Sequence, residues 1–253
     1  KPLAALEKLS PLLAQEPENG SLWDYQLAAL VMADRHTEAE QAFDRCQQLG
    51  AIFSETLANA CNNAKKLLKP ELVLARGKQL EQLDKASGLK WQVEALLELK
   101  QAEAAKRAAD KLMLIAGDDM ACQHLAIQTL RMQGDEKAAL GLVNRALTEN
   151  PGDGRLTSAR IELCVALGDT EMALSVAQQW ADEHPQRSSA KHLSSICFYS
   201  QYPSQTTVTQ RRHRAEQFAN FVCRDTTPYK NWKNSLEADR PLRIGLLSGD
   251  LRS

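Results

Sequence analysis

The chain has 253 residues, of which 43% are hydrophobic, 25% charged and 5% aromatic. Its 31 lysines and arginines nearly balance its 32 aspartates and glutamates, which gives a formal net charge of −1. Proteins that bind DNA or RNA usually carry a basic excess, so this balance argues against a nucleic-acid partner. No run of about 18 apolar residues occurs, so we expect no membrane span. The composition favours one or two helix-rich domains over a sandwich or barrel.

The first part of the chain reads as a series of amphipathic helices. Residues 2–15 suit one helix, and a helical pair follows that carries Trp23 in its first helix and Phe43 in its second. In this pair, Thr37 with Glu40 predicts a capping box at the start of the second helix. Further helices are predicted over four ranges: 54–69, 70–84, 89–99 and 101–116.

A period of 34 residues is clearest in the middle of the chain. Three features recur 34 positions apart: Gly134-Asp135, Ala139-Leu140 and Pro151 correspond to Gly168-Asp169, Ala173-Leu174 and Pro185. Gly and Asp suit a tight turn between antiparallel helices, and the small Ala lets those helices approach closely. The period and these residues resemble the tetratricopeptide repeat. We therefore predict an all-α, right-handed superhelical solenoid over residues 1–185, with about five to six repeats and roughly eleven helices.

Two more helices are predicted after the repeats, within residues 186–223. The first covers 187–201. The second covers 206–223, and Thr207-x-x-Gln210 predicts a capping box at its start. This helix also carries a basic run at 211–214, which suits either a solvated helix face or a phosphate-binding patch.

The end of the chain changes from helical to strand-like patterning. Residues 224–240 are polar and rich in turn-forming residues, which predicts a linker. Residues 241–253 include an apolar run at 242–247 that is typical of a strand buried on both faces of a parallel sheet. Since the chain begins at Lys1 and this strand has no partner strand, we expect the chain to be a piece of a longer protein.

The cysteines and tryptophans are predicted to be core residues. No C-x-x-C pair and no Cys/His cluster with zinc spacing is present, so the sequence predicts no metal site. Isolated cysteines pack like small apolar residues, so we expect reduced thiols buried in the helices of a cytoplasmic protein. These residues are Cys46, Cys61, Cys122, Cys164, Cys197 and Cys223, with Trp23, Trp91 and Trp180 expected beside them.

The candidate binding surface is the inner groove of the solenoid, because the first helices of stacked repeats line that face. No catalytic residues are predicted: no nucleophile–base pair or paired carboxylates can be assembled, and residues 245–249 do not match a nucleotide loop. The groove positions of two successive repeats are polar, which suits binding of an extended peptide or simple solvation. The predicted groove residues are His124, Gln128 and Arg131 in one repeat and Arg155, Ser158 and Glu162 in the next.

The terminal sequence Arg240-Pro-Leu-Arg-Ile-Gly-Leu-Leu-Ser-Gly-Asp-Leu-Arg-Ser253, following 34-residue repeats, resembles a known enzyme family. It is similar to the first catalytic strand of the bacterial, SPINDLY-like branch of the O-linked N-acetylglucosamine transferases. The helical segment 212–218 is also similar to that family's segment between repeats and catalytic domain. The resemblance implies that the repeats precede a Rossmann-like glycosyltransferase of the GT-B type.

The resemblance implies a function for the longer protein and none for this chain alone. The parent would transfer N-acetylglucosamine from UDP-N-acetylglucosamine to Ser or Thr of acceptor proteins, by an inverting displacement without metal. The repeats would recruit the acceptor. This chain would carry no catalytic residue and no cofactor, because the family's His-Pro pair and donor-binding lobe would follow Ser253.

Two other interpretations remain open at this point. The chain also suits a non-enzymatic repeat scaffold or assembly chaperone. Alternatively, the glycosyltransferase would use fucose or glucose donors, or Asn acceptors. In each case we expect a protein or peptide partner in the groove, and a homodimer is conceivable through the solenoid or through the strand at 242–247.

Overall fold

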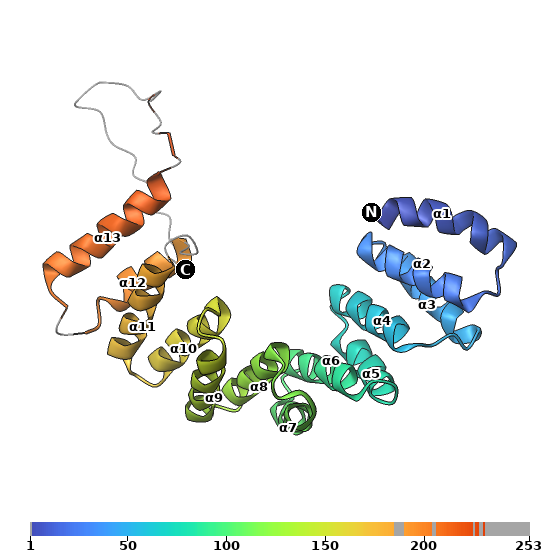
Figure 1. The fold of residues 1–253 in the computed structure, drawn as a ribbon, viewed down its shortest axis with the longest axis horizontal. Coiled ribbons are helices and arrows are strands. Elements are labelled where there is room, and N and C mark those ends of the chain that lie inside the picture. The colour runs from blue at the N-terminus through green and yellow to red at the C-terminus, as the bar shows by residue number, and fades with distance from the viewer. Residues whose placement is uncertain (1, 185–189, 204–205, 225, 228–229, 231–253) are drawn as a thin grey trace, which may run out of the picture.

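The computed structural model describes residues 2–184, 190–203, 206–224, 226–227 and 230. Within these residues it contains thirteen α-helices and no strand, which confirms the predicted all-α fold. The helices follow one another along an arc from α1 to α13 (Figure 1). The predicted strand at 241–253 lies outside the described residues.

Eleven helices precede residue 184, as predicted, and they form consecutive antiparallel pairs after α1. The helix α1 covers Pro2–Gln15 and packs against α2. The five pairs are α2 Gly20–Met32 with α3 His36–Gln48, α4 Ser54–Lys66 with α5 Pro70–Glu81, α6 Lys85–Glu98 with α7 Ala102–Ala116, α8 Met120–Met132 with α9 Glu136–Glu149, and α10 Gly154–Ala166 with α11 Thr170–Glu183.

The turn inside each pair has a residue in the left-handed backbone conformation. These residues recur 32 to 34 positions apart, and their φ angles lie between 55° and 82°: Asp34, Leu68, Lys100, Gly134 and Gly168. Only the last two are glycines, the residue that adopts positive φ without steric cost. The repeat therefore extends over the whole series of pairs, including those in which the sequence pattern is weak.

A small or β-branched residue lies five positions after each of these turns and is buried against the partner helix. Ala139 and Ala173 are fully buried, as the period predicted, and their counterparts in the earlier pairs are Ala39, Val73 and Ala105. Since these residues are 0 to 2% exposed, a larger side chain at any of them would meet packed neighbours.

Several predicted helix starts and ends are wrong. The capping box at Thr37 and Glu40 does not form: α3 begins at His36, and Arg35 at its N-cap makes no side-chain capping bond. The helix α6 begins four residues earlier than predicted, because the Asp84 carboxylate accepts a hydrogen bond of 3.1 Å from the Ser87 N–H. The ranges 54–69 and 70–84 were each too long by three residues at the C-terminal end.

Glu40 instead takes part in a buried ion pair that joins two repeats. Its Oε2 lies 2.6 Å from Nη2 of Arg76 on α5, whose side chain is 6% exposed. Arg76 also donates to the carbonyl of Ala60 at 2.8 Å and lies over the ring of Phe43 at 4.4 Å. Burial raises the pKa of Glu40, but hydrogen bonds from Arg76 and Asn63 outweigh it and lower that pKa below its usual value.

The cysteine prediction holds for four of the six residues. Cys46, Cys61, Cys122 and Cys164 are buried free thiols. Burial raises the pKa of Cys46 to about 11 and that of Cys61 to about 12, so both stay protonated and unreactive. Cys197 is only half-buried and Cys223 is exposed, so their predicted burial is wrong. Of the tryptophans, Trp180 is buried, while Trp23 and Trp91 pack half-buried against the core.

The two helices predicted after the repeats are present as α12, Ala190–Tyr199, and α13, Val208–Cys223. The capping box of α13 forms as predicted: the Thr207 N–H donates to Gln210 Oε1 at 2.9 Å, and the Gln210 N–H donates to Thr207 Oγ1 at 3.3 Å. In the basic run, Arg212 pairs with Glu216 at 2.9 Å. None of the helices in the described ranges is long and apolar enough to cross a membrane.

Candidate functional site

The first helices of the repeats lie on the inner side of the arc, where Figure 1 shows α6 and α8, while α7 and α9 lie on its outer side. Along this inner side, α2 packs against α4 and α6 packs against α8. Between α8 and α10 the surface is hollowed by about 1010 Å³. We call this space, lined by both helices, the α8–α10 hollow.

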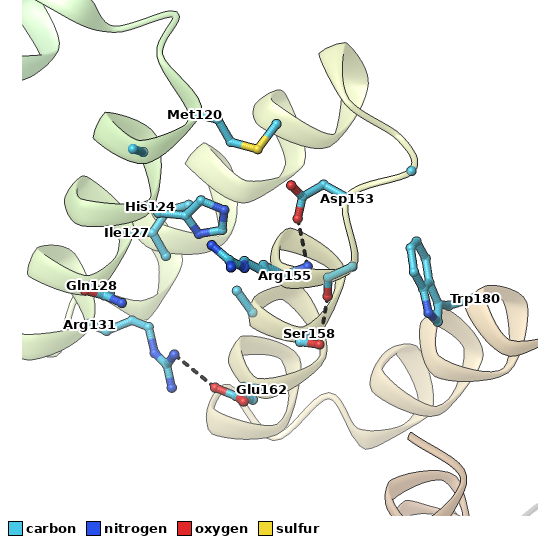
Figure 2. A pocket seen from close by; sticks show the side chains of 14 residues that line it. Met120, His124, Ile127, Gln128, Arg131, Asp153, Arg155, Ser158, Glu162 and Trp180 are labelled. Atoms are coloured by element: carbon cyan, nitrogen blue, oxygen red, sulfur yellow. Dashed lines mark hydrogen bonds and ion pairs between the residues drawn. The ribbon is translucent and has the colours of Figure 1, made fainter. Parts of the chain in front are cut away.

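All six groove residues predicted from the sequence line the α8–α10 hollow. The period placed them on one face of their helices, and the curvature of the solenoid brings the two rows opposite each other (Figure 2). The helix α8 supplies His124, Gln128 and Arg131, and the helix α10 supplies Arg155, Ser158 and Glu162.

Arg131 and Glu162 form an ion pair that spans the hollow. Nη1 of Arg131 lies 3.0 Å from Oε2 of Glu162, and the two side chains are 41% and 44% exposed. An equivalent pair joins Lys65 on α4 to Glu94 on α6 at 2.5 Å. Exposed pairs of this kind stabilise by about 0 to 1 kcal/mol, so they set geometry more than they add stability.

Ser158 uses its hydroxyl within its own helix, where it donates to the carbonyl of Gly154 at 2.8 Å. The Asp153 side chain caps α10, because its Oδ1 accepts from the backbone N–H groups of Arg155 and Leu156 at 2.7 and 2.8 Å. Both residues border the hollow, yet their hydrogen-bonding groups are engaged in holding the start of α10.

Three polar side chains in the hollow are not engaged in this way. Nε2 of His124 is shielded from solvent and has no hydrogen-bond partner among the described residues. Within the same residues, the Arg155 guanidinium and the Gln128 amide make no hydrogen bond or ion pair. Figure 2 shows the Arg155 side chain extending from α10 towards His124. The Gln128 amide and the Arg155 guanidinium are therefore open to a ligand, while Nε2 of His124 becomes so only when the side chains that cover it move.

The apolar part of the lining comes partly from a residue that the sequence pattern did not place there. Trp180 belongs to α11, the second helix of its repeat, and was predicted only as a core residue. It reaches the hollow because residue 154 is glycine: a Cβ there would lie 3.0 Å from Trp180 Cζ2. The indole also stacks on His184, with ring centroids 3.9 Å apart. The available signal is a tryptophan one period after Ala146, with Gly154 at a helix start 26 positions before it.

The hollow shares lining residues with two smaller ones. One of about 340 Å³ shares His124, Gln128 and Arg155 and reaches Lys90 and Glu94 on α6. Another of about 700 Å³ shares Gln128 and Arg131 and extends towards the start of α7 and α9. An occupant longer than the central hollow therefore has room to continue along the groove.

The lining does not suit metal binding or covalent catalysis. No group of three or more His, Cys, Asp or Glu side chains with metal-binding geometry occurs in the described ranges. The only thiols near α8 and α10, Cys122 and Cys164, are buried, and burial raises their pKa values. The lining offers hydrogen-bonding groups and apolar surface.

Comparisons with known proteins agree on the fold. No protein-family model and no curated protein matches the chain. A tetratricopeptide repeat protein from Parabacteroides merdae superposes with a TM-score of 0.66 at 15% identity, over 87% of this chain and 86% of that one. PilF of Pseudomonas aeruginosa gives 0.62 at 11% identity, over 81% and 90% of the two chains. YrrB, described as a repeat protein with an unusual peptide-binding site, superposes with a TM-score of 0.58 at 14% identity, over 72% of this chain and 95% of that one.

These similarities, together with the repeated turns and buried alanines, show that the chain folds as a tetratricopeptide repeat solenoid. Identities of 11 to 15% show the fold alone, so they do not extend to the partners of those proteins.

Proposed function

We propose that the α8–α10 hollow and its two extensions bind an extended segment of a partner protein. The observation that carries this proposal is the set of unengaged polar groups on facing rows, those of His124, Gln128 and Arg155. An extended peptide presents backbone N–H and C=O groups at regular spacing, and such side chains hydrogen-bond to them. The peptide-binding site described for YrrB, a protein of the same fold, adds support.

A blocked groove tests this function. Ala121 is exposed and lines both the α8–α10 hollow and the smaller hollow beside it, so Ala121→Trp fills the groove without entering the core. Peptides selected on the wild-type protein from a phage library should lose binding to this variant. Ala138→Trp, at an exposed position on α9, is the matched control and should bind them normally. Equal binding to both variants would place the peptide elsewhere.

A second candidate function is recruitment of acceptor proteins to a glycosyltransferase domain. It rests on the resemblance of residues 240–253 to the first catalytic strand of the O-linked N-acetylglucosamine transferases. Those residues lie outside the described part of the chain. In this proposal the longer, cytoplasmic protein uses UDP-N-acetylglucosamine without metal, and the chain alone is inactive.

The two candidates separate in the full-length natural protein. Incubation with UDP-N-acetylglucosamine, and with other nucleotide sugars, should give donor hydrolysis or transfer to an acceptor protein if the second candidate is right. No reaction with any donor would leave the first function, a repeat scaffold that binds a protein segment. Light scattering of the purified chain would test the predicted homodimer in the same samples.

A further inference from the structure

At the centre of the groove, we propose that the bound segment places one internal aspartate or glutamate against Arg155, His124 and Gln128. The inference rests on the proposed function and adds the chemistry of the occupant. It follows from three features of the α8–α10 hollow: its charges, its unpartnered buried atom and the two smaller hollows that adjoin it.

The charges of the lining leave one cation without a partner. Arg131 is paired with Glu162 at 3.0 Å, and the Asp153 carboxylate accepts two backbone N–H groups at the start of α10. The Arg155 guanidinium faces the hollow and has no acidic partner in the part of the chain that the structure describes. A ligand with one negative charge would complete the pairing.

The neighbouring groups provide further hydrogen bonds for the same ligand. Nε2 of His124 is shielded from solvent without a partner, so a ligand oxygen that displaces its cover and accepts a hydrogen bond there would satisfy it. In the tautomer that carries its proton on Nε2, His124 donates, as do the Gln128 amide and the five N–H groups of Arg155. A carboxylate has two oxygens that accept several such bonds, and bonds between charged partners are the stronger kind.

The same lining disfavours other anions. A phosphorylated side chain carries nearly two negative charges, whereas the lining has one cation, Arg155, without an acidic partner among the described residues, so the second charge would remain unbalanced. Because two smaller hollows share its lining, a peptide has room to continue past the central hollow. The carboxylate is therefore assigned to a side chain within the segment and not to a free C-terminus.

A peptide library displayed on a phage coat protein, with no free C-terminus, supplies the probes. The pool selected on the wild-type protein should be enriched in Asp or Glu at one position. Replacing that residue by Asn or Gln in a synthetic peptide with both ends blocked should weaken binding at least about tenfold, as measured by fluorescence anisotropy.

Variants of the protein separate a direct contact from a structural effect. Arg155→Gln should weaken binding of the acidic peptide about tenfold, and should leave binding of its amide counterpart nearly unchanged. Arg107→Gln removes the same charge from an exposed position on α7 and should change neither affinity. Circular dichroism checks that each variant is folded.

Several results would overturn the inference. These are a selected pool without acidic enrichment, equal weakening of both peptides by Arg155→Gln, tighter binding of a phosphoserine peptide, or a requirement for a free C-terminal carboxylate. If neutral peptides bind and Ala121→Trp still blocks them, the proposed function stands and only the acidic contact fails. If no peptide binds at all, the proposed function fails with it.

Discussion

Removing Glu40 should destabilise the solenoid more than removing its partner Arg76. In Glu40→Ala the Arg76 guanidinium, 6% exposed, loses its carboxylate and keeps only the Ala60 carbonyl and the Phe43 ring. Breaking a buried ion pair on one side costs about 3 to 5 kcal/mol. Since the Glu40 side chain is 25% exposed, water re-enters on its side, and we expect the lower end of that range, about 3 kcal/mol.

The reverse change leaves a charge that water can reach. In Arg76→Met the remaining Glu40 carboxylate still accepts from Asn63 Nδ2 at 2.6 Å, so we expect a loss of about 1 to 3 kcal/mol. The double variant Glu40→Leu with Arg76→Met removes both charges and should lie within about 2 kcal/mol of the wild type, well below the sum of the single losses.

Urea unfolding followed by circular dichroism gives these free energies of unfolding. Hydrogen exchange of the amides in α3 to α5 shows whether the loss of stability is confined to these helices. The exchange measurement is needed because solenoids open locally, so one global transition does not describe them fully. If the loss in the double variant equals the sum of the two single losses, Glu40 and Arg76 do not stabilise each other and the reasoning is refuted. A larger loss in Arg76→Met than in Glu40→Ala would refute the burial-based ranking.

Three further changes test the register and the ion pair. Gly168→Ala should lose about 1 kcal/mol by chemical denaturation, because an L residue is strained at φ +82° although a Cβ there meets no neighbouring atom; an unchanged midpoint would contradict the strained turn. Ala173→Leu should lose about 1 to 3 kcal/mol in a thermal melt, since the site is fully buried; full stability would mean the site is not packed. The lowered pKa of folded Glu40 means that its stabilisation is present above the unfolded value of about 4.3 and is lost as pH falls through the folded value. Glu40→Gln should therefore flatten the acid limb of a pH titration of stability, and an unaltered limb would exclude Glu40.

The sequence predicted the fold wherever local residues carry the signal. Gly134 and Gly168 mark turns that the structure confirms, and the six residues that the period places on one face of their helices line the α8–α10 hollow. Leu68 and Lys100 adopt the same positive φ, although Leu and Lys do not favour that conformation. Their turns were therefore not predictable from residue type, since the packing of the two flanking helices imposes the conformation.

Where long-range contacts decide, local patterns failed. Glu40 has the spacing of a capping residue after Thr37, but its carboxylate forms an ion pair with Arg76, 36 positions away. No capping box forms at the start of α3. The α8–α10 hollow was not predictable for a related reason. Its width depends on how two repeats stack, and the indole of Trp180 reaches it only because Gly154 leaves room.

The joints along the inner side of the arc differ in what holds them. The helices α2 and α4, and α6 and α8, approach each other closely, and the ion pairs Lys65–Glu94 and Arg131–Glu162 add a polar link from α4 to α6 and from α8 to α10. Packed apolar surfaces resist deformation, while half-exposed ion pairs weaken as salt screens them over about 8 Å. The joint between α8 and α10 also has a buried apolar core, to which Ile127, Leu156 and Leu163 contribute, so salt should weaken the ion pair without separating the two helices. The groove that the proposed ligand occupies should therefore keep its width as the salt concentration rises, while the ion pair across it opens.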